Sequence, residues 1–200
     1  MNTEANLSDN NLFIILFYSR NKDNKGLKNY KQRRMSFVSR TGVTENIYEQ
    51  FQLFVKKGVN GEMSRLYVSL NAYDSSRVQK QLQHYLLDNI VDLEKLDAVI
   101  ASLATKTQPL TKRCLLDYDG DMDDFYIFDN EVRQLVGDNY LESYKTVSGA
   151  GIVVKKSFDI RELLAKYPNV EFKRTDAMFL YDYKIKEEVR EWHEKMPVKI

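Results

Sequence analysis

Apolar and polar positions follow two different periods along this chain. Residues 12–19 (LFIILFYS) form an apolar run rich in β-branched and aromatic side chains, which is typical of a buried strand. Residues 46–55 instead place apolar side chains on one face at helical spacing, after Thr44, a residue type that caps helices. The apolar face consists of Ile47, Phe51, Phe54 and Val55. The two patterns predict that strands and helices alternate in one fold.

The remaining elements follow from the same periodicities and from turn residues. Strands are predicted over 33–39, 65–71 and 112–119, a hairpin over 141–147 and 151–155, and a strand or strand pair over 170–184. Helices are predicted over 74–90, 91–103, 124–136, 160–166 and 186–194. This order indicates an α+β fold in which helices pack on a mixed or antiparallel sheet.

Composition narrows the class of protein. A hydrophobic content of 43% is enough for a core, and 8 Gly and 3 Pro argue against a low-complexity chain. The single cysteine, Cys114, excludes an internal disulfide framework and a cysteine-based zinc cluster. The first ten residues are polar, and the longest apolar run, 12–18, is far shorter than the ~20 residues that span a bilayer. We therefore expect a cytoplasmic protein with no membrane partner.

The segment 114–124 (CLLDYDGDMDD) leads from apolar residues straight into a series of aspartates. Side chains at i and i+2 of a strand share a face, so Asp117 and Asp119 are expected to project together. Two close carboxylates repel unless a cation lies between them, and Mg²⁺ prefers oxygen ligands. The segment therefore predicts a divalent metal site of the kind that serves phosphoryl and nucleotidyl transfer. The alternative is a solvated acidic turn after a buried strand.

An EF-hand calcium loop is excluded by position. Such a loop needs Gly at its sixth position and Glu at its twelfth. Counted from Asp117, these positions hold Met122 and Phe128, and a count from Asp119 fails as well.

A phosphatase stays open as a less favoured alternative. Residues 115–121 (LLDYDGD) resemble the opening motif of haloacid-dehalogenase-type phosphatases, in which Asp117 would be the nucleophile and Asp119 the acid/base. That motif normally continues Gly-Thr, whereas Asp121 stands in place of the Thr. The family's closing Gly-Asp motif could be sought only in residues 137–138, which follow too closely to leave room for the intervening elements.

Basic residues gather between positions 20 and 40, where eight Lys and Arg face a single acid, although the net charge of the chain is only +1. Basic side chains attract phosphates, and the interleaved aromatic residues can stack on bases. This segment predicts a nucleic-acid-binding surface formed by Lys25, Lys28, Lys31, Arg33 and Arg34. A solvated lysine-rich loop is the alternative.

Three segments, taken in order, resemble the motifs of archaeo-eukaryotic primases and primase-polymerases. Those motifs are an apolar-Asp-x-Asp strand, a Ser/Gly-rich hairpin that ends in His, and an apolar residue followed by a third Asp. The matching segments are 116–119 (LDYD), 147–154 (VSGAGIVV) and 172–176 (FKRTD). Residues 157–161 (SFDIR) also resemble a Pro-Phe-Asp run seen in small viral relatives, and 65–71 the strand before the core.

The resemblance implies an RRM-like primase-type core over residues 64–184, with N-terminal strands, basic loop and helix over 1–63 and a helical tail over 185–200, all in one compact unit. It implies a metal-dependent nucleotidyltransferase acting on DNA or RNA, in a viral or mobile-element protein that would work in the host cytoplasm. Its partners would be nucleic acid, nucleoside triphosphates and replication proteins.

The same resemblance assigns site residues. Mg²⁺ or Mn²⁺ would be bound by Asp117, Asp119 and Asp176. Phosphate and nucleotide would be held by Ser148, Gly149, Gly151, Lys155, Lys173 and Arg174. One departure matters, because Ile152 or Val153 stands where the second motif has its His. A catalytically inactive nucleic-acid-binding or partner-binding protein on the same fold is therefore the runner-up.

Overall fold

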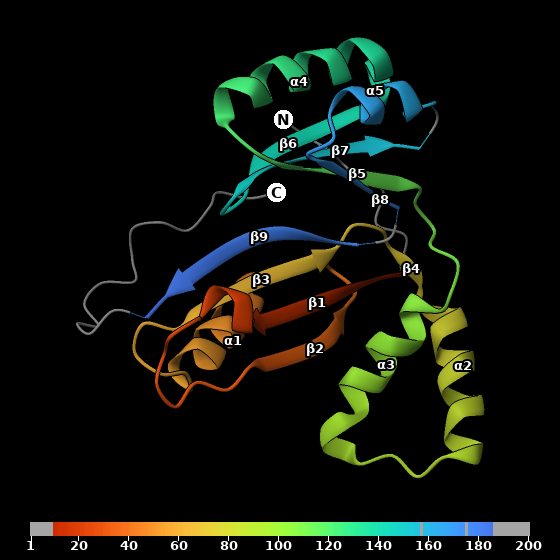
Figure 1. The fold of residues 1–200 in the computed structure, drawn as a ribbon. Helices are drawn as coiled ribbons and strands as arrows, with labels where there is room; N and C mark the ends of the chain where they lie inside the picture. Colours follow the sequence, from red (N-terminus) through yellow and green to blue (C-terminus); the bar gives the residue numbers. More distant parts are fainter. Residues whose placement is uncertain (1–9, 157, 175, 186–200) are drawn as a thin grey trace.

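Two antiparallel sheets face each other in this protein (Figure 1). The structure, a computed structural model, describes residues 10–156, 158–174 and 176–185. One sheet has the strand order β2-β1-β3-β9, with the short β4 paired to β1, and the other has the order β6-β7-β5-β8. The expected α+β class and antiparallel pairing are confirmed, but the strands divide between two sheets where the sequence suggested one.

The first sheet gathers strands from both ends of the chain. It contains β1 (Asn11–Ser19), β2 (Arg33–Ser39), β3 (Met63–Ser69), β4 (Tyr73–Asp74) and β9 (Ala177–Lys184). Helix α1 (Glu45–Lys56) covers its outer face and buries the four apolar residues that the sequence predicted. Phe17 of β1 packs against Phe51 and Phe54, with ring centroids 5.3 and 5.7 Å apart.

The second sheet is formed by one continuous stretch of chain. Its elements are β5 (Arg113–Asp119), α4 (Met122–Val136), β6 (Tyr140–Lys145), β7 (Gly149–Lys155), α5 (Arg161–Lys166) and β8 (Val170–Lys173). This β-α-β-β-α-β order, with β5 and β7 at the centre, is a split βαβ arrangement. Helix α4 ends at Gly137, whose φ of 53° favours glycine. Both helices lie on the outer face of the sheet (Figure 1).

Because side chains alternate along β5, one face of this strand is apolar and the other is acidic. Leu116 and Tyr118 join Cys114 in the core beneath α4. Asp117 and Asp119 point the other way, toward the first sheet, where both line a cavity. The prediction that these two carboxylates share a face is confirmed.

A helical hairpin packs against strands β1, β2 and β4 of the first sheet and projects from them (Figure 1). It consists of α2 (Ser75–Asp88), the 3₁₀ turn η2 (Leu93–Lys95) and α3 (Leu96–Thr105). Asp74 caps α2 by accepting from the backbone N–H groups of Ser76 and Arg77. Of the apolar positions on α2, Val78 is buried but Leu86 is exposed, because only the base of the hairpin meets the sheet.

The predicted strand pair over 170–184 does not stay in one sheet. Its first half is β8, at the edge of the second sheet, and its second half is β9, at the edge of the first. The expected division at residue 63 therefore does not coincide with the two sheets. The predicted helix 186–194 lies outside the described residues. Within the described part of the chain, no helix has the length and apolar character needed to cross a membrane.

The two sheets are joined by a small apolar cluster and by one asparagine. The cluster contains Leu70, Leu115 and Val153, and Tyr144 and Met178 pack against it. Asn71, which is 3% exposed, accepts hydrogen bonds from the Arg113 backbone N–H and the Thr111 hydroxyl, at 2.8 and 2.9 Å. Its amide donates to the carbonyl oxygens of Arg113 and Arg174, at 3.0 and 3.5 Å. Asn71 thereby ties the end of β3 to the start of β5 and the end of β8.

Replacing Asn71 with Ala is expected to lower the free energy of unfolding by about 3 kcal/mol, because several buried partners lose their hydrogen bonds at once. Urea unfolding followed by circular dichroism measures this loss. Asn130→Ala, at an exposed position in α4, is the matched control and should leave stability within about 0.5 kcal/mol of wild type. Equal stability of the two variants would show that Asn71 does not join the sheets.

Candidate functional site

A polar cavity of about 320 Å³ lies between the two sheets. The second sheet contributes acidic residues from β5 and β8, and the β8–β9 connection adds another. The first sheet and the turn that follows β1 contribute basic residues. Its charged lining residues are Asp117, Asp119, Glu171, Asp176, Arg20, Lys22, Arg65 and Lys173, and its aromatic ones are Tyr18, Tyr67, Tyr144 and Phe179. Opposite charges thus face each other across one space.

Lys173 lies at the centre of the acidic wall. Its Nζ is 2.7 Å from Asp117 Oδ2 and 3.4 Å from carboxylate oxygens of Glu171 and Asp176. The pairing of β5 with β8 sets Asp117 opposite Glu171 and so brings Lys173 to this place. Asp117 and Asp176, predicted from separate motifs, therefore meet through a lysine that the sequence had assigned to phosphate.

The charge state of Lys173 follows from these neighbours. Burial alone would lower the pKa of its ammonium, but the hydrogen bond to Asp117 and the charges of Asp117, Asp176 and Glu171 raise the pKa well above its ordinary value. Lys173 therefore stays protonated at physiological pH and neutralises part of the acidic wall.

Asp119 contacts the second predicted motif, the Ser/Gly-rich hairpin. The Ser148 hydroxyl donates to Asp119 Oδ1 at 3.1 Å, and β7 places Gly149 opposite Asp119 and Gly151 opposite Asp117. A Cβ at Gly149 would lie 1.9 Å from the Tyr118 carbonyl oxygen, so only glycine fits there. The acidic strand and the Ser/Gly-rich hairpin are thus brought together.

The carboxylates do not converge as a metal site in this structure. Oxygen donors of this kind suit Mg²⁺ or Mn²⁺. In the ranges that the structure describes, however, no three acidic, His or Cys side chains lie close enough to hold one ion. Asp117 and Asp176 turn to the Lys173 ammonium, and Asp119 turns to Ser148. The carboxylates therefore already have partners within the protein, an ammonium for Asp117 and Asp176 and a hydroxyl for Asp119.

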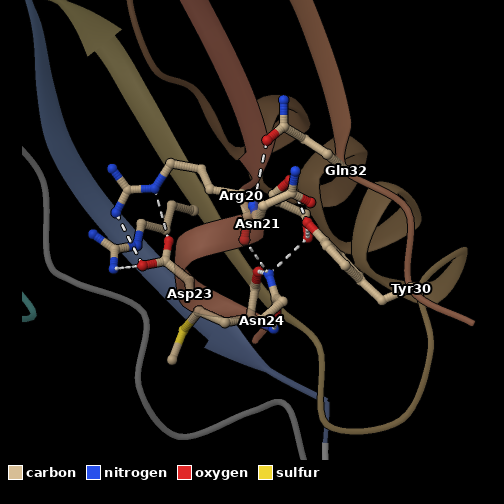
Figure 2. Close-up of polar contacts among 9 residues, drawn as sticks. Arg20, Asn21, Asp23, Asn24, Tyr30 and Gln32 are labelled. Atoms are coloured by element: carbon tan, nitrogen blue, oxygen red, sulfur yellow. Dashed lines mark hydrogen bonds and ion pairs between the residues drawn. The ribbon is translucent and has the colours of Figure 1, made fainter. Parts of the chain in front are cut away.

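Two residues of the basic wall, Arg20 and Lys22, come from the predicted basic segment 20–40, whereas Arg65 was not predicted. Asp23, in the 3₁₀ turn η1 (Asn21–Asp23), accepts from Arg20 Nε at 2.7 Å and from an Arg65 terminal nitrogen at 2.6 Å, and Figure 2 shows Asp23 against Arg20. Asn24 fixes this turn to β3, because its side chain bonds both the N–H and the carbonyl of Met63. Two guanidinium groups are therefore held in place at the cavity.

Arg65 combines burial with a free donor. Its residue is 9% exposed, and its Nε is buried with no hydrogen-bond partner among the described residues. A buried guanidinium with an unused N–H at the edge of a polar cavity is suited to an anion. The sequence carried one signal for it, a charged residue within the predicted strand 65–71, but no motif linked that residue to the acids.

One of the five residues predicted to form the nucleic-acid-binding surface, Arg33, has a structural role instead. Arg33 Nε donates to Glu62 at 3.0 Å, another of its nitrogens donates to the Phe54 carbonyl at 2.7 Å, and its guanidinium lies 4.4 Å from the Phe54 ring centroid. Because Glu62 is fully buried, Arg33 is needed to compensate its charge and is not available to bind nucleic acid. The four that remain, Lys25, Lys28, Lys31 and Arg34, are exposed outside the cavity.

Two further predicted residues lie away from the cavity. Lys155 is exposed at the end of β7, and Arg174 lies with its guanidinium 5.8 Å from the centroid of the Phe172 ring. Neither lines the space between Asp117 and Arg65. Their assignment to phosphate is not supported by position.

Tyr144 lines the cavity and also packs against the apolar cluster between the sheets. Burial raises the pKa of its phenol, as does the nearby charge of Asp117, and the backbone of Phe179 hydrogen-bonds it. A neutral phenol from the second sheet thus touches β9 of the first, beside the acids.

None of the protein-family models, curated proteins or solved structures compared with this chain matches it. The candidate site therefore rests on its own geometry. The resemblance to primases stays a prediction.

Asp23→Ala is expected to destabilise the protein by about 3 kcal/mol, because Arg65 would keep a buried charge without its partner. Removing both charges in Asp23→Ala/Arg65→Met should recover part of that loss. Chemical denaturation of the single and double variants measures both effects. Glu131→Gln, which breaks an exposed ion pair with Lys166, is the control and should leave the stability nearly unchanged. A double variant less stable than Asp23→Ala would contradict the buried-charge explanation.

Proposed function

We propose that the cavity between the sheets binds a nucleoside triphosphate and that the protein is a primase-type nucleotidyltransferase acting on DNA or RNA. The observation that carries this proposal is the composition of the cavity. One wall holds carboxylates from two of the predicted motifs, and the other holds fixed cations beside aromatic rings. Nucleotides need these groups together, because they combine phosphates, hydroxyls and a flat base.

The basic wall supports a phosphate-bearing ligand. Arg65 offers an unused N–H, and Arg20 and Lys22 add positive charge within the same lining. Hydrogen bonds between guanidinium groups and phosphate are among the stronger polar contacts in proteins. Tyr18, Tyr67 and Phe179 provide ring faces or edges for a base. A cavity of about 320 Å³ is of the size that small-molecule ligands occupy.

The connectivity of the second sheet supports an RRM-like core. Its β-α-β-β-α-β order places β5 and β7 at the centre, and nucleic acid binds RRM domains on the sheet face free of helices. Here that face carries Asp117 and Asp119. The position of the acids thus agrees with the primase-type core implied by the sequence.

The proposal includes Mg²⁺ or Mn²⁺ at Asp117, Asp119 and Asp176. Such an ion, when bound, supplies charge stabilisation and lowers the pKa of an attacking hydroxyl. Lys173 must first give up its contacts with Asp117 and Asp176 for these carboxylates to be free. Its ammonium would then be available to a phosphate in the same cavity.

A second candidate is a catalytically silent protein that binds nucleotide or nucleic acid. Lys173 favours it, because a protonated lysine already satisfies the carboxylates. The second motif favours it as well. Ile152 and Val153 stand where the His is expected, and both apolar side chains are fully buried.

Primer extension and de novo synthesis with labelled nucleotides and Mn²⁺ or Mg²⁺ test the first candidate. Wild type is expected to incorporate nucleotide, and Asp117→Asn/Asp119→Asn to fall to background, because the carboxylates at the reacting end are lost. Asp123→Asn/Asp124→Asn removes two acids of the same segment outside the cavity and should keep activity. Nucleotide binding by wild type without incorporation would instead support the silent binding protein.

Lys173→Met is expected to raise the affinity for Mn²⁺ by about tenfold or more, because a competing ammonium leaves the carboxylates. Titration followed by electron paramagnetic resonance measures free Mn²⁺ directly, without reference to activity. Lys155→Met, at an exposed position outside the cavity, should leave the affinity unchanged. Unchanged or weaker binding by Lys173→Met would show that the lysine does not compete with a metal ion.

A further inference from the structure

A second cavity, of about 310 Å³, lies where the second sheet meets the α1-bearing face of the first sheet, and it shares none of its lining with the first cavity. The inter-sheet cluster that includes Leu115 and Tyr144 stands between the two spaces. The second cavity is lined by Phe13, Thr41, Gly42, Val43, Val68, Ser69, Leu70, Arg113, Leu141, Glu142, Val153, Met178 and Leu180. Most of these side chains are apolar, unlike those of the first cavity.

The cavity is open to solvent, because several of the side chains that line it are only half-buried. Its volume is of the size that small-molecule ligands occupy. Leu141, Met178 and Leu180 turn apolar atoms into it and remain only half-buried. Filling the space with apolar groups would remove that surface from water and so favour a bound molecule.

Two charged side chains border the apolar walls. Arg113, from β5, and Glu142, from β6, both line the cavity and are half-buried. Within the described ranges, neither side chain forms an ion pair, and neither guanidinium nor carboxylate has a hydrogen-bond partner. A ligand that is only an anion would satisfy Arg113 and be repelled by Glu142, and the reverse holds for a cation.

We infer that this cavity binds a small zwitterion with an apolar body, the chemical class that includes apolar α-amino acids. The ligand's carboxylate would pair with Arg113, its ammonium with Glu142, and its apolar part would lie against Met178 and Leu180. The inference does not depend on the nucleotide site, because the two cavities have separate linings.

Binding of L-phenylalanine and L-leucine, followed by methyl chemical shifts in the full-length protein, tests the site. Saturable shifts are expected at the methyl groups of Val153, Met178 and Leu180. N-acetyl-L-phenylalanine and L-phenylalanine amide, which each keep one charge, should bind about tenfold more weakly or worse. Equal binding of all three forms of phenylalanine, or no saturable shift at millimolar ligand, would overturn the inference.

Single substitutions test the contributions of Arg113 and Glu142 to binding one at a time. Arg113→Gln and Glu142→Gln should each weaken L-phenylalanine by about tenfold. The Glu142→Gln variant should bind N-acetyl-L-phenylalanine with the same affinity as wild type or more tightly. Lys112→Gln and Glu162→Gln, both exposed and outside the lining, are the matched controls. Val43→Phe should abolish binding by filling the space. Binding that survives both charge variants would show that the ligand is held elsewhere.

Discussion

The position of β5 between β7 and β8 is the constraint on which the rest of the site depends. One face of this strand is sealed by α4 through Leu116 and Tyr118, so its other face must turn toward the first sheet. The same pairing sets Gly149 beside Asp119 and places Lys173 within reach of Asp117. A shift of one residue would exchange the two faces, burying the acids under a helix.

Charge compensation follows from this placement. Lys173 neutralises part of the charge of the acidic wall, and Asp23 neutralises part of the charge of Arg20 and Arg65. Each wall therefore keeps an excess of its own charge on its side of the cavity. A ligand enters such a site by exchanging one ion-pair partner for another, which favours molecules that carry both phosphates and cations or hydrogen-bond donors.

Local periodicity predicted much of the fold. The bounds of β1, β2 and α1, and the shared face of Asp117 and Asp119, follow from side-chain alternation over a few residues. What could not be predicted depends on long-range packing. The separation of β8 and β9 into different sheets, and the arrival of Arg65 opposite the acids, leave no periodic signal, because they arise only when two sheets meet. Arg33 shows the same limit, since its buried partner Glu62 is twenty-nine residues away.

The apolar cluster between the sheets also divides the space beside it into two cavities. Leu115 and Val153 are buried there, with a polar cavity on one side and an apolar cavity on the other. Tyr144 lies in the polar lining, whereas Glu142, two residues earlier on β6, lies in the apolar one. The cluster therefore separates the two cavities, and the hydrogen bonds of Asn71 hold the two sheets together beside it.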